Sequence, residues 1–420
     1  MRAGGDALGD VLELAERMWQ GEIAPPTITS VSNDLTQVAD DTGFVWSMAN
    51  VTAFRTGDGL VLVDTGSEFM GGNIQQAVRS WTGEPVHSAV YSHGHIDHVF
   101  GILKFEAEVH PARVIAHENV APRFDRYVMT ADYNSLVNIR QFSLPGIRWP
   151  TTYRYPDETY RDELTVTVGD EIFELHHAKG ETDDATWTWV PARKVLCTGD
   201  LFIWASPNAG NPQKVQRYPI EWARAARHMA ALGAEVLLPG HGVPILGAGR
   251  IREALSDVAE LLEHLHDETV AQMNQGATLD QILHTVTAPP HLLAKPYLGP
   301  TYDDPEFVVR NVWRLYGGWW DGDPASLKPA PQRDLARELA ELAGGAHVLA
   351  KRAEELAEHG DLRLAGHLAE LAAFASEDGH PTRARVNELR ASNETSTMAK
   401  GIYNWAAKES RDAMKKGEEP

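Results

Sequence analysis

The spacing of apolar residues along the chain changes character near residue 247. Before that point, short apolar runs rich in β-branched residues stop at Gly, Asp or Pro, which is typical of strands that lead into loops. The clearest runs are residues 60–63, 88–91, 114–116, 164–168, 195–197 and 236–238. Helices are expected between them, at residues 72–81 and 219–232. This alternation predicts a mixed α/β domain of layered sheets and helices over residues 1–247.

Beyond residue 247 the pattern becomes almost wholly helical. Apolar residues at spacings of three and four form one face of a helix; they are Ile251, Leu255, Val258, Leu261, Leu262 and Leu265. A second block, residues 334–375, is rich in Ala, Leu and Glu and predicts core positions at Leu335, Leu339, Leu342, Leu349, Leu356 and Leu364. Paired helices of this kind stack as a bundle. We therefore expect an all-α domain over residues 248–392 and a polar C-terminal tail over residues 393–420.

Composition narrows the class of protein. Among the 420 residues, 38 basic and 59 acidic side chains give a net charge of −21. Such a surface repels phosphate backbones, so we expect no nucleic-acid partner and no binding to anionic membranes. The single cysteine, Cys197, excludes an intrachain disulfide and a zinc site built on several cysteines. The start of the chain lacks the apolar core of a signal peptide and no run approaches about 18 apolar residues, which predicts a cytoplasmic protein.

The segment with the clearest chemistry is His93-Gly94-His95-Ile96-Asp97-His98, which directly follows the strand expected at 88–91. Three imidazoles and a carboxylate so close together are not typical of core packing. Alternate residues of a loop at a strand end point in different directions, so one run can supply ligands to two metal ions. Histidine and carboxylate ligands without a thiolate suit zinc and also accept manganese or iron. We therefore expect two divalent metal ions, with zinc favoured.

Further ligands are expected at the ends of later strands, because one loop cannot complete two coordination spheres. The candidates are the stretch His176-His177-Ala178-Lys179-Gly180-Glu181, Asp200 and His241, each of which follows an apolar run, beside glycines that let the backbone approach closely. Asp64 also ends an apolar run. We expect Asp64 to be a buried carboxylate that braces the loops through hydrogen bonds to their backbone amides.

The series Asp64-Thr65-Gly66, His93-x-His95-x-Asp97-His98, Gly199-Asp200 and Gly240-His241 resembles the metallo-β-lactamase-fold hydrolase superfamily over residues 25–247. The resemblance implies an α/β fold in which two β-sheets are sandwiched between helices (αββα), with a two-metal site at one edge. It also implies the ligand sets. The first metal would bind His93 and His95, the second would bind Asp97, His98 and His241, and Asp200 would bridge both.

Glu181 points to one branch of this superfamily. Most members have Gly-His-Thr where this chain has Gly180-Glu181-Thr182, so Glu181 replaces the third histidine of the first metal, which resembles the alkylsulfatases. Residues 268–278 and 316–324 resemble the helical alkylsulfatase dimerisation domain, which implies a homodimer with that domain over residues 250–390. We expect the aromatic cluster of this region either in the core or at the subunit interface; it comprises Trp313, Tyr316, Trp319 and Trp320.

Three features depart from the alkylsulfatase pattern. The expected bridging residue is Asp200 rather than a glutamate, and we expect no sterol-carrier-like C-terminal domain such as full-length members carry. The stretch 302–307 also lacks the histidine proposed as proton donor to the leaving group. These departures concern the substrate rather than the fold, and we expect an alkyl group shorter or more branched than that of a detergent.

Together, these expectations describe a dinuclear-metal-dependent hydrolase of small-molecule alkyl sulfate esters. Two ions lower the pKa of a shared water to about 7, and the hydroxide would attack the ester and release sulfate and alcohol. Asp97 and Asp200 would orient the hydroxide or carry a proton. The same site could instead hydrolyse a lactone, a carboxylic ester, a thioester or a phosphoester, because fold does not determine function. A non-catalytic metal protein is a third alternative.

A negatively charged substrate needs positive charge in a protein of net charge −21. Arg217 and Lys214 lie between Asp200 and the helix expected at residue 219. Arginine suits a planar contact with oxyanions, although both residues could equally be solvated loop charges. Tyr133 resembles the tyrosine that lines the alkylsulfatase pocket, and a place in the core is the alternative. We therefore predict Arg217, Lys214 and Tyr133 as substrate contacts.

Overall fold

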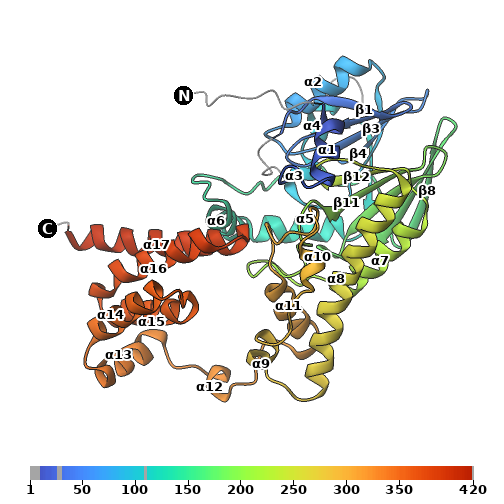
Figure 1. The fold of residues 1–420 in the computed structure, drawn as a ribbon. Coiled ribbons are helices and arrows are strands. Elements are labelled where there is room, and N and C mark those ends of the chain that lie inside the picture. Colours follow the sequence, from blue (N-terminus) through green and yellow to red (C-terminus); the bar gives the residue numbers. More distant parts are fainter. Residues whose placement is uncertain (1–9, 26–30, 108–110, 419–420) are drawn as a thin grey trace.

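The computed structural model describes residues 10–25, 31–107 and 111–418, and its first half is built on two β-sheets (Figure 1). The first sheet has seven strands in chain order: β1 (Leu35–Ala39), β2 (Thr42–Val45), β3 (Val51–Arg55), β4 (Leu60–Val63), β5 (Val86–Val90), β6 (Arg113–His117) and β7 (Glu158–Tyr160). Neighbours are antiparallel from β1 to β4 and parallel from β4 to β7.

The second sheet has the order β13-β12-β11-β10-β9-β8. Its strands are β8 (Glu163–Val168), β9 (Glu171–Ala178), β10 (Ala185–Val190), β11 (Val195–Ile203), β12 (Val236–His241) and β13 (Ile245–Leu246). Only β11 and β12 are parallel neighbours; the other pairs in this sheet are antiparallel.

Helices cover the outer face of each sheet. The helices of this half are α1 (Val11–Trp19), α2 (Gly71–Trp81), α3 (Ile96–Val99), α4 (Ile102–Glu106), α5 (Val120–Met129), α6 (Ala131–Phe142) and α7 (Pro219–Ala231). One apolar core joins the first sheet to α2, α4 and α5. A second core lies between the two sheets and extends to α7 and to α8 (Ala248–Asn274). The layers are therefore helix, sheet, sheet and helix, which confirms the expected αββα sandwich.

Strand β4 shows why the short apolar runs are fully buried. Val61 and Val63 contribute to the core between the sheets, whereas Leu60 and Leu62 contribute to the core under α2. Successive side chains of a strand point to opposite faces, and both faces of this strand are covered. A continuous apolar run, rather than an alternating one, is the result.

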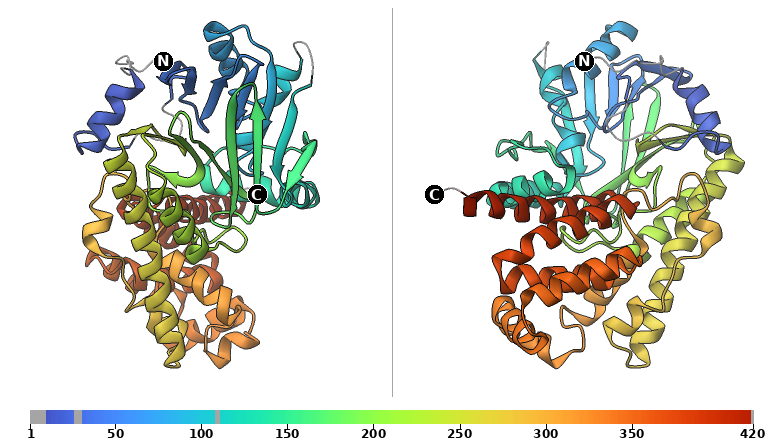
Figure 2. Two further views of the ribbon diagram at one scale, coloured as in Figure 1. Left: turned by 90° about the vertical axis from the view of Figure 1, so that its right-hand side faces the viewer. Right: turned by 60° about the vertical axis from the view of Figure 1, so that its left-hand side comes forward.

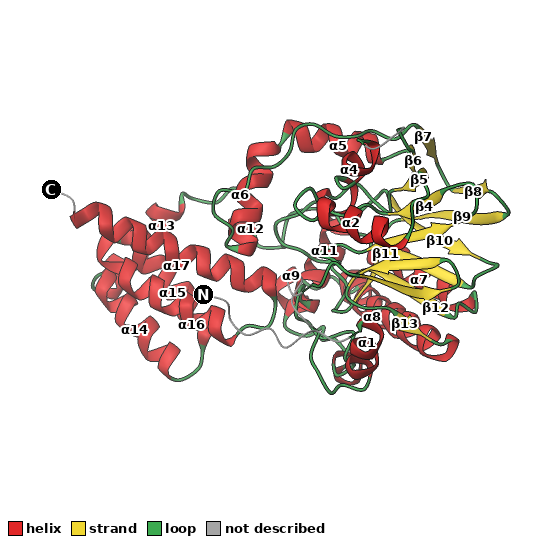
Figure 3. Ribbon diagram, turned by 90° about the horizontal axis from the view of Figure 1, so that it is seen from above, coloured by secondary structure: helices red, strands yellow, loops and turns green. Residues whose placement is uncertain are grey.

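The second half of the chain is helical. Besides α8 it contains α9 (Leu279–Leu283), α10 (Pro290–Leu293), α11 (Pro305–Gly317), α12 (Pro324–Leu327), α13 (Gln332–Ala343), α14 (Ala346–Glu358), α15 (Leu362–Ala375), α16 (His380–Asn393) and α17 (Thr397–Glu418). All six apolar residues predicted for one face of α8 are buried, and α8 packs between α7 and α11. Seen from above, the strands gather at one end of the molecule and α13 to α17 at the other (Figure 3).

Four of the six leucines predicted as the core of the second helical block lie outside it, whereas Leu349 and Leu356 are partly buried and Leu356 packs against that core. Leu335, Leu339, Leu342 and Leu364 are exposed, and Leu342 keeps 83% of its surface accessible. The small core of this block is instead made of Ala353, Ala365, Ala369 and Val386. Apolar spacing identifies the face of a helix that will be buried but not the surface that buries it, and alanines allow these helices to pack closely.

The C-terminal segment differs from the predicted polar tail, because residues 397–418 form the long helix α17. Met398, Ala399, Ala407 and Ser410 are buried along it. α17 packs against α16 and also against α6 of the first half (Figure 2). The mixed charge of this segment concealed a helical face of small and apolar residues. None of the described helices combines the length and apolar character that crossing a membrane requires.

Candidate metal centre

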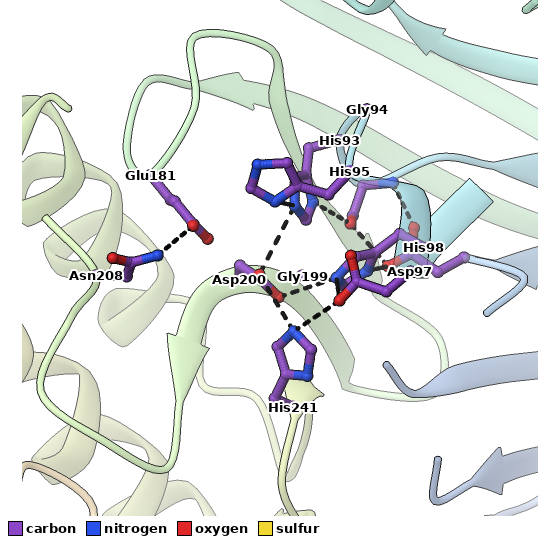
Figure 4. A network of polar contacts seen from close by, with 12 residues as sticks. His93, Gly94, His95, Asp97, His98, Glu181, Gly199, Asp200, Asn208 and His241 are labelled. Atoms are coloured by element: carbon purple, nitrogen blue, oxygen red, sulfur yellow. Dashed lines mark hydrogen bonds and ion pairs between the residues drawn. The ribbon is translucent and has the colours of Figure 1, made fainter. Parts of the chain in front are cut away.

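The seven predicted ligands come from four places in the two sheets (Figure 4). His93 and His95 lie in the loop after β5, and Asp97 and His98 lie in α3, which begins one residue after His95. Asp200 lies within β11, His241 is the last residue of β12, and Glu181 lies in the turn after β9. The site is therefore assembled where strand ends of both sheets meet.

These side chains form two adjacent groups. The ligand atoms of the first group, His93, His95, Glu181 and Asp200, all lie within 4.8 Å of one another, and so do those of the second group, Asp97, His98 and His241. Asp200 joins the groups: its Oδ1 lies 3.4 Å from His98 Nε2, and its Oδ2 lies 3.4 Å from His241 Nε2.

A glycine makes this position of Asp200 possible. A Cβ atom on Gly240 would lie 2.1 Å from Asp200 Oδ1. Any other residue before His241 would therefore displace the carboxylate that both groups share. This is the close backbone approach that the glycine next to His241 indicates.

The charges of the cluster act on one another. Burial lowers the pKa of His93 to about 4, and burial together with His93 holds the pKa of His95 well below its usual value. Burial also disfavours the charged forms of His98 and His241, but Asp200 outweighs it. The pKa of His241 rises to about 9 and that of His98 well above its usual value. Asp200 thus stabilises positive charge on His98 and His241, as it would stabilise a bound cation.

Unpaired atoms agree with this electrostatic picture. His98 Nε2 and Asp200 Oδ1 are buried and lie 3.4 Å apart, but neither forms a hydrogen bond with the other or with another described residue. Buried polar atoms are normally paired, and imidazole nitrogens with carboxylate oxygens are ligands that suit divalent metals. The residues present therefore fit metal ions, and the cluster has the donor atoms of a metal-binding site.

Asp64 braces this site, as predicted. Its Oδ1 accepts the backbone N–H of Ser92 at 2.7 Å, and its Oδ2 accepts the Ser92 hydroxyl at 2.7 Å. The same Oδ2 lies 2.7 Å from His98 Nδ1. Because a carboxylate only accepts, His98 carries a proton on Nδ1, so that a neutral His98 would present a bare Nε2 to the second group.

Two further braces were not predicted. Asp184 Oδ2 accepts the backbone N–H of Gly94 at 3.1 Å and the Nε–H of Arg123 at 2.6 Å, so this buried pair holds the loop between His93 and His95. Asn208 donates its amide to Glu181 Oε1. Arg123 and Asn208 belong to no motif, and no sequence signal marks either of them.

Arg217 is buried against Glu181. Its Nη2 donates to Glu181 Oε1 at 3.3 Å, and its Nη1 donates to the Glu181 carbonyl. Its Nε is buried without a hydrogen-bond partner among the described residues. Burial raises the pKa of Glu181 to about 8 against the opposing effect of Arg217. With both donors on Oε1, Oε2 is the atom of Glu181 that is left for the first group.

The other two predicted substrate contacts lie in different surroundings. Lys214 is half-buried, with its Nζ 5.6 Å from the ring centre of Trp149. Burial lowers the pKa of Lys214 to about 8. Tyr133 lies on α6 with 59% of its surface exposed. Tyr127 on α5 stacks on His95 at 6.4 Å between ring centres.

Two family models match the chain. The metallo-beta-lactamase superfamily matches residues 45–241, and the alkyl sulfatase dimerisation domain matches residues 278–413. A linear primary-alkylsulfatase from Pseudomonas sp. is 27% identical over 353 residues, which are 77% of this chain and 65% of that protein. An (R)-specific secondary-alkylsulfatase from Pseudomonas sp. is 26% identical over 401 residues, which are 87% of this chain and 60% of that protein. The chain thus spans less than two thirds of the length of these relatives.

A solved structure has the same fold over nearly the whole chain. The stereoselective inverting sec-alkylsulfatase Pisa1 from Pseudomonas sp. superposes with a TM-score of 0.81 at 24% identity. The match covers 91% of this chain and 66% of that one. The matches of both halves of the molecule and the glutamate in the first ligand group therefore agree with the same family. The chain carries a metallo-β-lactamase superfamily domain followed by an alkyl sulfatase dimerisation domain, and its relatives fit the alkylsulfatase-like branch of that superfamily.

Proposed function

We propose that the protein is a hydrolase that uses two divalent metal ions to cleave alkyl sulfate esters into sulfate and alcohol. The observation that carries this proposal is the buried Arg217, held on Glu181 beside two adjacent groups of metal-ligand type. The names of the relatives as alkylsulfatases agree with it. Residues 1–247 would form the catalytic domain, and the helices that follow would serve dimerisation.

The roles of the ligands follow from the two groups. His93, His95 and Glu181 Oε2 would hold the first ion, Asp97, His98 and His241 the second, and Asp200 would contact both. Two divalent ions, for which zinc is the choice that these donors favour, would supply Lewis acidity and lower the pKa of a bound water to about 7. Asp97 and Asp200 would orient the attacking water and accept its proton.

Arg217 and Lys214 would bind the sulfate group. Arg217 Nε is a buried donor in need of an acceptor, and a sulfate oxygen would satisfy it. Lys214 is close enough to Arg217 and Glu181 for their charges to affect its pKa. The two cations would offset the negative charge of the ester in a protein of net charge −21. Tyr133, if it contacts substrate, would do so from the exposed surface of α6.

The proposal predicts sulfate release from a short primary or secondary alkyl sulfate by protein loaded with metal. Glu181→Ala and His95→Ala each remove a ligand of the first ion. We expect each to reduce the rate by at least about 1,000-fold, because the metal contributes several kcal/mol to such reactions. Free sulfate would be measured directly. His284→Ala changes an exposed histidine of the helical half and should leave the rate unchanged.

The bond that is cleaved is tested in the same assay. If Arg217 and Lys214 are arranged to bind a sulfate ester, p-nitrophenyl acetate and p-nitrophenyl phosphate should be poorer substrates than p-nitrophenyl sulfate. Protein that holds two ions, releases no sulfate and hydrolyses the acetate or the phosphate would contradict the proposed substrate. Full activity after exhaustive chelation would contradict the metal requirement.

We also propose a homodimer. Leu335, Leu339 and Leu342 are exposed at helical spacing on α13, and the aromatic residues Trp319 and Trp320 are exposed nearby in sequence. Exposed apolar residues grouped on one helix face mark a binding surface, and the match to a dimerisation domain makes a second copy of the chain the natural occupant.

Light scattering should therefore give twice the 46.3 kDa mass of one chain at micromolar concentration. Leu342→Asp places a charge in the proposed interface and should shift the mass towards the monomer. Glu341→Ala, on the neighbouring exposed position of α13, is the matched control and should remain dimeric. A monomeric wild-type protein would refute the dimer.

A further inference from the structure

The loop between β11 and α7, residues 204–218, carries Asn208, Lys214 and Arg217 and is held by the helical half of the chain. The carboxylate of Asp303, just before α11, accepts the backbone N–H groups of Gly210 at 2.6 Å and of Asn211 at 3.1 Å. A Cβ atom on Gly210 would lie 2.4 Å from the backbone of Phe307 in α11. The loop therefore lies directly against α11, with no room for a side chain at residue 210.

Asn311 of α11 holds the far end of the same loop. Its side-chain Nδ2 donates to the carbonyl of Arg217 at 2.9 Å, and its Oδ1 accepts the backbone N–H of Arg217 at 3.3 Å. Arg314 Nη2 also donates to Asn311 Oδ1 at 3.1 Å. Gln216 Nε2 donates to the same oxygen at 3.1 Å. Three donors on one oxygen define the orientation of the amide. Asn311 is buried, so water does not compete for these bonds.

The backbone of Arg217 determines where its guanidinium lies. The guanidinium donates to the carbonyl and to Oε1 of Glu181, and Asn208, from the same loop, donates to that Oε1 as well. These donors leave Glu181 Oε2 facing the first ligand group. A continuous chain of hydrogen bonds thus leads from α11 through Arg217 to a residue of the metal centre.

We propose that Asn311 is a positioning residue of the metal centre: by holding the Arg217 backbone, it keeps the guanidinium on Glu181 and Glu181 Oε2 directed at the first ion. The helical half would then be part of the active site and not only a dimerisation module. This inference rests on the metal-binding part of the proposed function and not on the identity of the ester.

The test compares metal affinity among three variants. Asn311→Ala removes both bonds to Arg217, and we expect the affinity for the first ion to fall about tenfold, the lower end for residues that orient a ligand. Asn311→Asp is almost isosteric but places a carboxylate oxygen against the Arg217 carbonyl, so its affinity should fall at least as far. Arg310→Ala, an exposed neighbour on α11, is the matched control and should bind both ions as the wild type does.

Zinc affinity would be measured by competition with a chromophoric chelator, alongside thermal unfolding of the metal-free proteins. Added zinc should restore the activity of Asn311→Ala, because only occupancy of the site is reduced. Wild-type metal affinity in both Asn311 variants, with or without a lower melting temperature, would overturn the inference and leave Asn311 a purely structural residue. If the wild type releases no sulfate but the affinities differ as expected, the substrate proposal fails and the positioning role stands.

Discussion

Asp200→Asn should abolish activity, with a fall of at least about 1,000-fold that corresponds to about 4 kcal/mol of transition-state stabilisation. The substitution keeps the shape of the side chain and removes only its charge. Asp200 lies 3.4 Å from both His98 and His241 and 3.7 Å from His93, so among the described residues it is the carboxylate that contacts histidines of both ligand groups. Without it, the negative charge that attracts the ions is reduced in both groups at once.

The measurement combines metal content with sulfate release. We expect Asp200→Asn to lose both ions on gel filtration, whereas loss of a ligand from one group, as in Glu181→Ala, should affect one ion more than the other. Glu235→Gln removes the same charge from an exposed ion pair with Lys194 and should behave as the wild type. An Asp200→Asn protein that keeps two ions and normal turnover would show that the groups do not share this residue.

Asp64→Asn should weaken binding of the second ion by about 10- to 100-fold, the range found when a residue that orients a ligand is replaced. Both oxygens of Asp64 accept hydrogen bonds, from Ser92 and from His98. An amide must turn its NH₂ towards one of these donors. If it faces His98 Nδ1, the proton moves to Nε2, and the nitrogen that faces the second group can no longer bind a metal.

The same substitution should lower the free energy of unfolding by about 1–3 kcal/mol, because one buried donor is left unpaired. Asp64 has a backbone φ of 57°, which asparagine adopts as readily as aspartate, so backbone strain does not contribute. Zinc titration and denaturant unfolding of the metal-free protein would measure the two effects. Asp58→Asn, in the exposed turn before β4, is the control. Unchanged affinity for the second ion would exclude control of the His98 tautomer by Asp64.

The local part of the site could be read from the sequence. His93, His95, Asp97 and His98 are close in the chain, so one strand, one turn and the short helix α3 are enough to bring them together. Asp200 and His241 could be added because each follows an apolar run, and strand ends of packed sheets meet at one edge. Glu181 was distinguished from the neighbouring His176 and His177 by the resemblance to the alkylsulfatases. The burial of Asp64 followed from the same reasoning.

Sequence patterns did not predict the contacts that orient the ligands. Arg123 and Asp184 are 61 residues apart, and Arg217 and Asn311 are 94 apart. Asn208 reaches Glu181 across 27 residues. Polar residues of this kind are common on surfaces, and only the packing of α5 and α11 against the sandwich makes these few of them buried partners.

The two halves of the chain differ in what their sequences determined by themselves. Periodicity and turn residues were sufficient for a mixed α/β first half and for the buried face of α8, because these faces are covered by neighbouring elements of the same chain. The αββα order of the layers was implied by the resemblance to the superfamily. The same periodicity identified Leu335 and Leu342 as apolar positions of a helix but not their exposure, and the mixed charge of residues 397–418 concealed α17. Local spacing determines which side of a helix or strand is apolar, whereas the surface that covers it depends on contacts between distant segments, which only the tertiary structure decides.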